Sequence, residues 1–482
     1  MTLNSAITAA VSGIYAASRA SSVVSDNLSN ALTPGHSRRV LSLSSNGPGI
    51  PGVKVGNIQL VKDPGLLASR RVSESEYAAA EQTANFFSRM ADAVGTVDDP
   101  FSLASRQSAL ESALVEAISR PDSGPRLNEL SVRANQLADS INSAASELQN
   151  QRQIAENSID TQITQLNQGL KDIERLNAKI VIANASGHDP VGLIDQRDQV
   201  VDQINQIVPL NVVTRDNGQV ALFSEGGEIL LEGTASQFSF VKNRIILPHM
   251  TIDNGLLSGL EIDGRPIGTG PEGRLRGGTL TAAFQIRDDH AVSAQKDLDT
   301  MARDLIERFQ DPAVDPSLSA TDAGLFTDAG AAFDPANELG IANRISLNEK
   351  VSLNGDAETW RFRDGLNAAA PGDPGDASLL RAYSDALNQT RTISTPSLGT
   401  IDISASTLAA DLISRFAQDN ETSTNRVTFT AAGFREASEA EQSQGVDTDV
   451  ELQNLLIIEQ NYNANARVIT VVNELMDTLL RI

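Results

Sequence analysis

Both ends of the chain carry residues in a spacing that is typical of helices packed against other helices. Near the start, apolar and small residues recur at alternating steps of four and three positions. These are Leu3, Ile7, Ala10, Ile14, Ala17, Ser21, Val24 and Leu28. That spacing places them along one seam of a helix. Because many of them are small, two helices can approach closely there, but the seam buries little apolar area and is not expected to be ordered alone.

The end of the chain has a second seam of similar length. It consists of Leu452, Leu455, Glu459, Tyr462, Ala466, Ile469, Asn473, Met476 and Leu480. Just before it, Thr448 and Glu451 have the spacing of a capping box, which predicts that Thr448 caps the helix. We therefore expect the two ends to pair as a coiled coil. The pattern leaves open whether this pair closes one subunit or joins neighbouring copies.

The stretch NALTPGHSRRV, which begins at Asn30, separates the first seam from the rest of the chain. Thr33, Pro34 and Gly35 predict that the helix breaks here, because proline removes a backbone donor and glycine favours a helix end.

The two ends also differ in charge. Residues 1–62 hold five basic side chains and one acid (5 − 1 = +4), whereas residues 440–482 hold two arginines and seven acids (2 − 7 = −5). Opposite charges favour a meeting of the two ends, although chance also explains the difference.

Most of the remaining chain has helical periodicity. We predict helices at 66–94, 103–119 and 191–207. Between them lies a long helix with heptads from Leu127 to Leu148 and from Ile159 to Ile180. The eleven-residue step between the two runs is a stutter, which locally unwinds a supercoil without ending the helix.

The periodicity changes to two after residue 208. Alternating residues predict strands at 210–214, 219–223 and 228–231, with Asn217-Gly218 as a hairpin turn. Helical spacing returns at 280–309. Residues 311–375 are rich in Asp, Ala, Gly and Pro and are predicted to be irregular, with a short strand at 360–363. Helices are expected at 376–392 and 405–418, and a helical return leg is expected to lead to Ser443.

The predicted fold is therefore mainly α with a β-rich insertion, and its length calls for more than one domain. The expected parts are a terminal coiled-coil domain (1–35 with 445–482) and a helical rod domain (36–207 with 277–310 and 405–444). A β-rich inserted domain (208–276) and an irregular or mixed insertion without an assigned role (311–404) complete the chain.

Composition excludes several classes of function. The formal charge of 38 − 62 = −24 disfavours partners such as nucleic acid or an anionic membrane, which need a basic surface. The chain has no cysteine, which excludes disulfides and thiol catalysis. Its start lacks the features of a cleaved signal peptide, and no apolar run is long enough to span a membrane.

No string of residues predicts an enzyme. The four histidines are dispersed, without metal-ligand spacing. Gly268, Gly270 and Gly273 match a dinucleotide fingerprint, but Pro271 interrupts it, so a plain loop is expected. Asp195 and Asp198 are interpreted as a solvated face suited to a helix dipole, with a catalytic carboxylate pair as the alternative. We predict no catalytic, cofactor or metal site.

Four stretches resemble the bacterial flagellar axial proteins, a family of rod, hook and hook-associated proteins, in the correct order. They are SGIYAASRASSVVSDNLSNALTPGHSRRV, GVKVGNIQLVKDPGLLASR, GLIDQRDQVVDQINQIVPLNVVTRDNGQV and SQGVDTDVELQNLLIIEQNYNANARVITVVNELMDTLLRI. Within these proteins, TPGHSRR and LIDQRD look like segments of the hook-associated protein 1 (FlgK) family.

The resemblance implies an adaptor at the junction between flagellar hook and filament, extracellular and exported by the type III route without a cleaved signal. It implies four partners: further copies of the chain, hook protein, the second junction protein and an export chaperone on the C-terminal helix. The seam residues would make the assembly contacts. The alternatives are another axial protein, such as hook protein, or a secreted enzyme with its activity in the inserted lobe.

Overall fold

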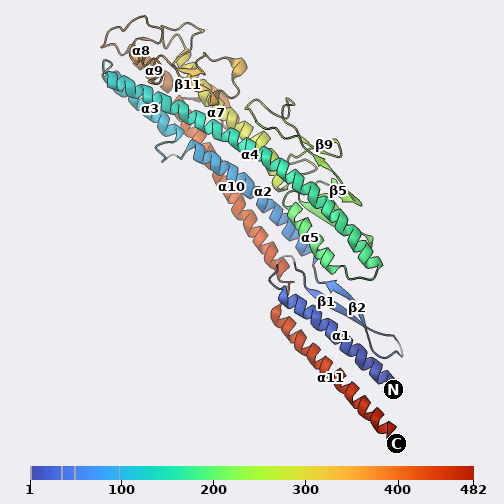
Figure 1. Cartoon of the computed structure of the whole chain (residues 1–482). Helices are drawn as coiled ribbons and strands as arrows, with labels where there is room; N and C mark the ends of the chain where they lie inside the picture. Colours follow the sequence, from blue (N-terminus) through green and yellow to red (C-terminus); the bar gives the residue numbers. More distant parts are fainter. Residues whose placement is uncertain (1–2, 34–35, 48–49, 97, 482) are drawn as a thin grey trace.

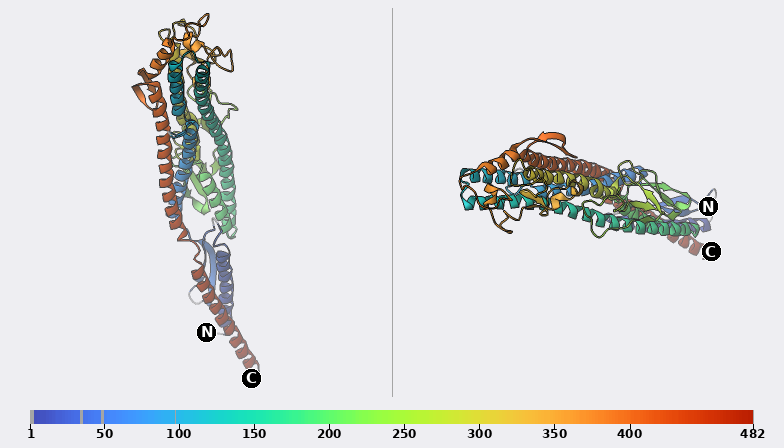
Figure 2. Two further views of the ribbon diagram at one scale, coloured as in Figure 1. Left: turned by 90° about the vertical axis from the view of Figure 1, so that its left-hand side faces the viewer. Right: turned by 90° about the horizontal axis from the view of Figure 1, so that it is seen from above.

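The computed structural model describes residues 3–481 apart from 34–35, 48–49 and 97. The molecule is elongated, and both termini lie at the same end (Figure 1, Figure 2). There, α1 (Leu3–Ser29) and α11 (Thr448–Leu480) run side by side in opposite directions, and α11 extends beyond α1. Among the described residues, no helix has both the length and the hydropathy needed to cross a membrane.

A two-stranded hairpin follows α1. Its antiparallel strands are β1 (Arg39–Ser45) and β2 (Val53–Leu60), in a register that places Arg39 opposite Leu60. The hairpin packs against α1 and lies between the terminal helices and the body (Figure 1).

The body is built from long helices that lie along one another (Figure 2). These are α2 (Pro64–Val94), α3 (Leu103–Ser119), α4 (Gly124–Ala185) and α10 (Ala405–Gln442). The predicted long helix is confirmed as a single helix of 62 residues that continues through the stutter. The predicted helix at 405–418 and the predicted helical return leg to Ser443 form one continuous helix, α10.

The β-rich part lies against the second half of α4 and against α5 (Val191–Asn205). It contains one four-stranded and one three-stranded antiparallel sheet. The strands of the first are β3 (Leu210–Thr214), β4 (Val220–Ser224), β5 (Ile229–Glu232) and β6 (Thr234–Ala235), and those of the second are β7 (Phe238–Ser239), β8 (Leu260–Ile262) and β9 (Arg265–Ile267). The predicted turn is present, with positive φ at both Asn217 (58°) and Gly218 (81°).

The predicted helix at 280–309 is interrupted once. It consists of α6 (Gly278–Gln285), a π-helical turn at Ile286–His290 and α7 (Ala291–Gln310). The π turn adds a residue to the helix and brings Arg287 into the interior, where its side chain is fully buried.

Residues 311–404 are more structured than predicted. They contain two hairpins and two helices: β10 (Phe326–Asp328) with β11 (Ile345–Leu347), β12 (Arg391–Thr395) with β13 (Gly399–Ile403), α8 (Arg361–Asp364) and α9 (Ser378–Asn388). The predicted strand at 360–363 is wrong, because Arg361 instead starts the short helix α8. There its guanidinium pairs with Glu358 and donates to the carbonyls of Leu366 and Ala368.

The body has two hydrophobic cores. One joins α2, α3, α7, α9 and α10 to the first half of α4, and it includes buried residues of the 311–404 segment such as Phe326 and Phe362. The other joins the second half of α4 to α5, α6 and the two sheets. Mainly α architecture with small antiparallel sheets is thus confirmed, while the four domain boundaries proposed from the sequence stay predictions.

The aromatic centre of the first core gives a test of stability. Phe309 is fully buried, with its ring centroid 5.6 Å from that of Phe326 and 5.4 Å from that of Tyr383. Phe309→Ala should lower the free energy of unfolding by about 3–5 kcal/mol, measured by urea denaturation. Phe429→Ala is the matched control, since Phe429 is 73% exposed and its loss should change stability by less than about 0.5 kcal/mol. Equal effects of the two variants would contradict this description of the core.

Candidate assembly interface at the terminal helix pair

Small residues bring α1 and α11 close together. Ala10, Ala16 and Ala17 of α1 are buried. Gly13 faces Asn465 of α11 so closely that a Cβ atom on Gly13 would lie 2.7 Å from the Asn465 side chain. A larger residue at position 13 would have to displace the side chain of Asn465, so glycine at this position fits the close approach of the two helices.

The predicted residues of the N-terminal seam lie in or beside this contact. Val24 is buried, and the others are half-buried: Leu3, Ile7, Ile14 and Leu28. Their role in assembly remains a prediction.

The predicted C-terminal seam only partly faces α1. Leu455, Ala466 and Ile469 are half-buried, but the other predicted apolar members are exposed: Leu452 (45%), Tyr462 (44%), Met476 (44%) and Leu480 (81%). The best covered positions instead include Glu451, Ile458 and Val472. The side of α11 that faces α1 is therefore rotated by one position from the predicted seam. Glu459 and Asn473 lie beside this contact and not in it.

The outer side of α11 is unusually apolar for a solvated surface. Six large apolar side chains are more than half exposed: Leu456, Ile457, Val471, Leu475, Leu479 and Leu480. An exposed apolar patch of this extent on a single helix is typical of an interaction surface. Within one subunit, therefore, α1 covers one side of α11 and leaves the outer side exposed.

One buried side chain, that of Asn27, links the end of α1 to the start of β1. Of the predicted helix break, Thr33 is an exposed bend, whereas Pro34 and Gly35 lie outside the described residues. Asn27 is fully buried, donates to the carbonyl of Arg39 at 2.8 Å and accepts from its amide at 2.9 Å. Asn27 therefore fixes where β1 begins, a role that no sequence pattern revealed.

The opposite charges of the two ends meet within one subunit. Arg38 donates to Glu451 at 2.8 Å, and the Glu451 side chain is only 2% exposed. The predicted capping box is therefore wrong. Asp447 caps α11 by accepting from the amides of Asp449 and Val450, and Glu451 is occupied by Arg38.

A cluster of charges joins the hairpin to the body. Arg39 pairs with Asp26 of α1 and, at 2.9 Å, with Asp195 of α5. Lys62, just after β2, contacts Asp195 at 3.3 Å and Asp198 at 2.6 Å. Asp195 is thus held between two cations. Asp195 and Asp198, considered from the sequence as a dipole-complementing face or a catalytic pair, hold the hairpin against α5.

A second cluster of ion pairs, around Arg70, joins three helices of the body. Arg70 of α2 contacts Glu74 at 2.5 Å, Asp202 of α5 at 2.9 Å and Glu441 of α10 at 2.8 Å. Burial opposes its charge, but Asp202 and Glu441 outweigh that effect and raise the pKa of Arg70. This arginine ties the last turn of α10, directly before α11, to α2 and α5.

The glycine-rich string at Gly268–Gly273 forms a turned loop between β9 and α6. The amides of Thr279 and Leu280, at the start of α6, donate to the carbonyls of Gln206 and Ile207. Those amides are therefore already used and do not point at a phosphate. Among the described residues, no group of side chains has the arrangement of a metal site.

Comparisons with known proteins agree with this arrangement. Residues 87–312 match the helical domain of the flagellar hook-associated protein FlgK, and residues 437–482 match the C-terminal domain of the flagellar basal body rod proteins FlgE, FlgF and FlgG. The chain carries the helical domain of the FlgK family, which is a family of structural flagellar proteins. The resemblance to FlgK predicted from the sequence is confirmed.

Curated relatives of this family are distant in sequence. The chain is 25% identical over 298 residues to flagellar hook-associated protein 1 of Escherichia coli K12, covering 59% of this chain and 53% of the relative. It is 23% identical over 225 residues to the protein of the same name from Bacillus subtilis 168, covering 44% of each. The chain thus spans about half the length of the curated relatives it matches. The solved FlgK hook junction protein of Burkholderia pseudomallei aligns with a TM-score of 0.46 at 18% identity, over 55% of this chain and 47% of that one.

The ion pairs of Asp195 with Arg39 and Lys62, which we call the Asp195 clamp, give a test of how the hairpin is held against α5. Asp195→Asn removes the charge shared by Arg39 and Lys62, so β1 and β2 should dock less firmly on α5. These groups are partly exposed, which limits the effect to about 1.4 kcal/mol, or about tenfold faster hydrogen exchange of the amides of 39–60. Asp216→Asn, at an exposed turn residue, is the control and should leave exchange unchanged. Unchanged exchange in Asp195→Asn would show that the clamp does not hold the hairpin.

Proposed function

We propose that this protein is an adaptor at the junction between the flagellar hook and filament, which acts as structure and not as an enzyme. Two observations support the proposal. The match at 437–482 is shared with rod proteins, so it indicates an axial protein of some kind, whereas the match at 87–312 is to FlgK itself. That second match favours the junction over the hook or rod.

The observation that carries the assembly role is the exposed apolar side of α11. One subunit leaves Leu456, Ile457, Val471 and Leu475 more than half exposed, and burial of such side chains is the main driving force of association. In an axial array, each subunit makes heterologous contacts that do not close, so both sides of a terminal helix find neighbours. The predicted seam residues that α1 does not cover, such as Tyr462 and Met476, are then interface residues.

The same surface suits the proposed partners. Copies of this chain, hook protein and the second junction protein would cover α11 in the assembled structure. Before assembly the helix would associate with itself, so an export chaperone is expected to bind it. The proposed location is the exterior of the cell, reached by type III export without a cleaved signal.

Deletion of the gene tests the role at the junction. Cells should then carry hooks without filaments and release flagellin into the medium, because filament growth would lack its first layer. Electron microscopy and immunoblots of the culture medium measure both effects, and a plasmid-borne copy should restore filaments. Filaments of normal number on deleted cells would refute the adaptor role.

An acid at the terminal contact tests the seam. Ile14→Asp or Ile469→Asp introduces a charge between α1 and α11, where both residues are half-buried. Export should continue, while the fraction of cells with filaments should fall at least tenfold, as counted by fluorescence microscopy. Ile182→Asp is the matched control, since Ile182 is 65% exposed near the end of α4. If both terminal variants assemble like this control, the seam assignment fails.

A further inference from the structure

The outer side of α11 carries a second heptad seam, separate from the side that faces α1. Its members recur at alternating steps of four and three positions, and all of them are exposed. They are Ile457, Asn461, Ala464, Val468, Val471 and Leu475. We call them the outer seam of α11. This spacing is the one by which a helix receives another helix along its length, so the outer seam predicts a helix as its partner.

The other terminal helix has a matching seam on the side away from α11. Read from the end of α1 toward its start, the members are again spaced four and three positions apart, and all are exposed. They are Ser22, Ser18, Tyr15, Val11, Thr8 and Asn4, which we call the outer seam of α1. Val11 is 52% exposed and Tyr15 is 60% exposed. These two large side chains are thus left to solvent within one subunit.

The two outer seams match position for position when the helices run in opposite directions. Within one subunit α1 and α11 are antiparallel, with Gly13 opposite Asn465. A shift of one residue from that register, about 1.5 Å along the helix, brings the members of the outer seams opposite one another. Large side chains then meet smaller ones or each other. The pairs include Ile457 with Ser22, Ala464 with Tyr15, and Val468 with Val11.

A hollow beside α1 leaves room for the larger side chains. It lies between α1 and the hairpin and has a volume of about 460 Å³. Ser22, Ser25 and Ser29 line it from α1, and Val23 and Ile58 add apolar lining. The outer seam of α1 therefore borders a space that small residues keep open, at the position where the matching register places Ile457.

The charges at this hollow favour α11 as the occupant. Asp26 and Arg39 also line it but are paired with each other, which leaves Arg19, exposed and without an ion-pair partner among the described residues. The exposed charges of α11 that lack such a partner in the described part of the chain are mainly acidic. They are Asp449, Glu459, Glu474 and Asp477, against Arg467. The positive outer side of α1 therefore attracts the acidic helix α11.

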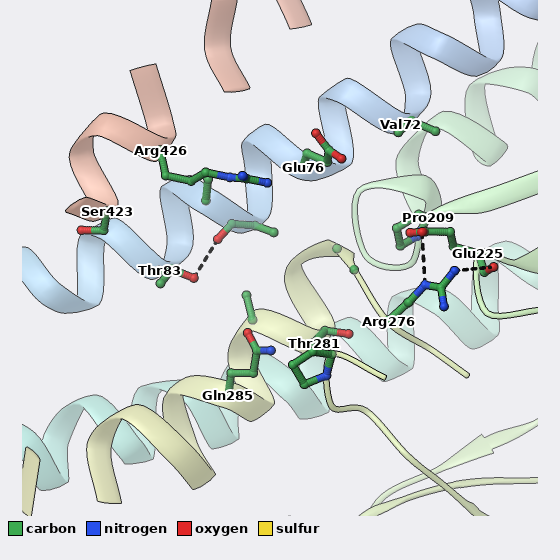
Figure 3. Close-up of a pocket in the computed structure, with 16 residues that line it drawn as sticks. Val72, Glu76, Thr83, Pro209, Glu225, Arg276, Thr281, Gln285, Ser423 and Arg426 are labelled. Carbon is green, nitrogen blue, oxygen red and sulfur yellow. Dashed lines mark hydrogen bonds and ion pairs between the residues drawn. The ribbon is translucent and has the colours of Figure 1, made fainter. Parts of the chain in front are cut away.

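The groove between α2, α6 and α10 offers no such match (Figure 3). Charged side chains of both signs line it, namely Glu76, Glu225, Arg276 and Arg426. Glu225 and Arg276 are paired at 3.1 Å. Because this lining selects neither an apolar nor an acidic helix, the outer seam of α11 fits the hollow beside α1 and not the groove.

We propose that the outer seam of α11 in one subunit packs, antiparallel, on the outer seam of α1 in the next subunit. This inference rests on the proposed assembly of many copies, and it names the surface that covers α11 there. Copies that point the same way bring α11 of one and α1 of the next together in the orientation that the two helices have within a subunit. The two seams are different surfaces of the chain, so the contact is heterologous and repeats from copy to copy.

The absence of cysteine from the sequence allows a direct test. A chain with both Val11→Cys and Val468→Cys is expressed in place of the natural protein, and isolated flagella are treated with the thiol oxidant diamide. Each position faces away from the partner helix of its own subunit, so a disulfide can form only between copies. Non-reducing gels should show dimers and a ladder of higher species, which neither single variant should give.

Val11→Cys combined with Thr470→Cys is the matched control. Thr470 is also exposed, but two positions along a helix are a rotation of about 200°, so this pair should stay monomeric. A ladder of equal strength in the control would overturn the docking. Monomer alone from the chain with Val11→Cys and Val468→Cys, in cells that carry filaments, would also overturn it while leaving the adaptor role intact. If deletion of the gene leaves filaments in place but the ladder forms, the docking stands and the junction role falls.

A charge placed on the outer seam of α1 provides a second measurement. Val11 is exposed within the subunit, so Val11→Asp should leave its fold and its export unchanged. In the assembly the carboxylate would be buried opposite Val468, and the fraction of cells with filaments should fall at least fivefold, as counted by fluorescence microscopy. Val115→Asp is the matched control, since Val115 is a 60% exposed valine of α3. Cells with Val11→Asp that are as filamented as this control would overturn the packing on the outer seam of α1.

Discussion

Both hydrophobic cores of the body are built on one helix, α4, and the rest of the structure depends on its continuity. Its first half contributes Leu130, Leu137 and Ile141 to one core, and its second half contributes Ile159, Leu166 and Ile173 to the other. The stutter between these halves contains Arg152 and Glu156, both fully buried. Polar contacts therefore occupy the point where the heptad seam changes side, and the two cores remain joined by a rigid element.

The link from this body to the terminal helices is electrostatic. Asp195, Asp198 and Asp202 lie on successive turns of one side of α5, spaced as neighbours on a helix surface. They receive Arg39, Lys62, Arg70 and Arg71 from the hairpin, from α2 and from the segment between them. Exposed ion pairs of this kind stabilise a structure less than an apolar core does, but they fix the relative orientation of the elements that they join. Such a joint orients the terminal pair without requiring a core of its own, which suits ends that bury little apolar surface.

Much of the fold could be predicted from sequence because its signals are local. The helix at 103–119 ends next to Pro121, and the Asn217-Gly218 turn needs only its two residues, so both were predicted correctly. The errors at the candidate interface concern contacts between distant residues. Glu451 has the spacing of a cap but is taken by Arg38, and no local rule reports an arginine more than four hundred positions away. The Asp195 clamp and the Asn27 bonds were missed for the same reason.

The contact of α11 with α1 is offset from the predicted seam but keeps its seven-residue spacing. Glu451, Ile458, Asn465 and Val472 are covered, and each lies one residue before a member of the predicted seam. Because each residue turns a helix by about 100°, an offset of one position moves the contact to a neighbouring side of α11. Glu459 and Asn473, the polar members of the predicted seam, therefore lie beside the contact with α1 and not in it. They lie on the boundary between the side facing α1 and the exposed apolar side, so a single helix can present one surface to its own chain and another to its neighbours.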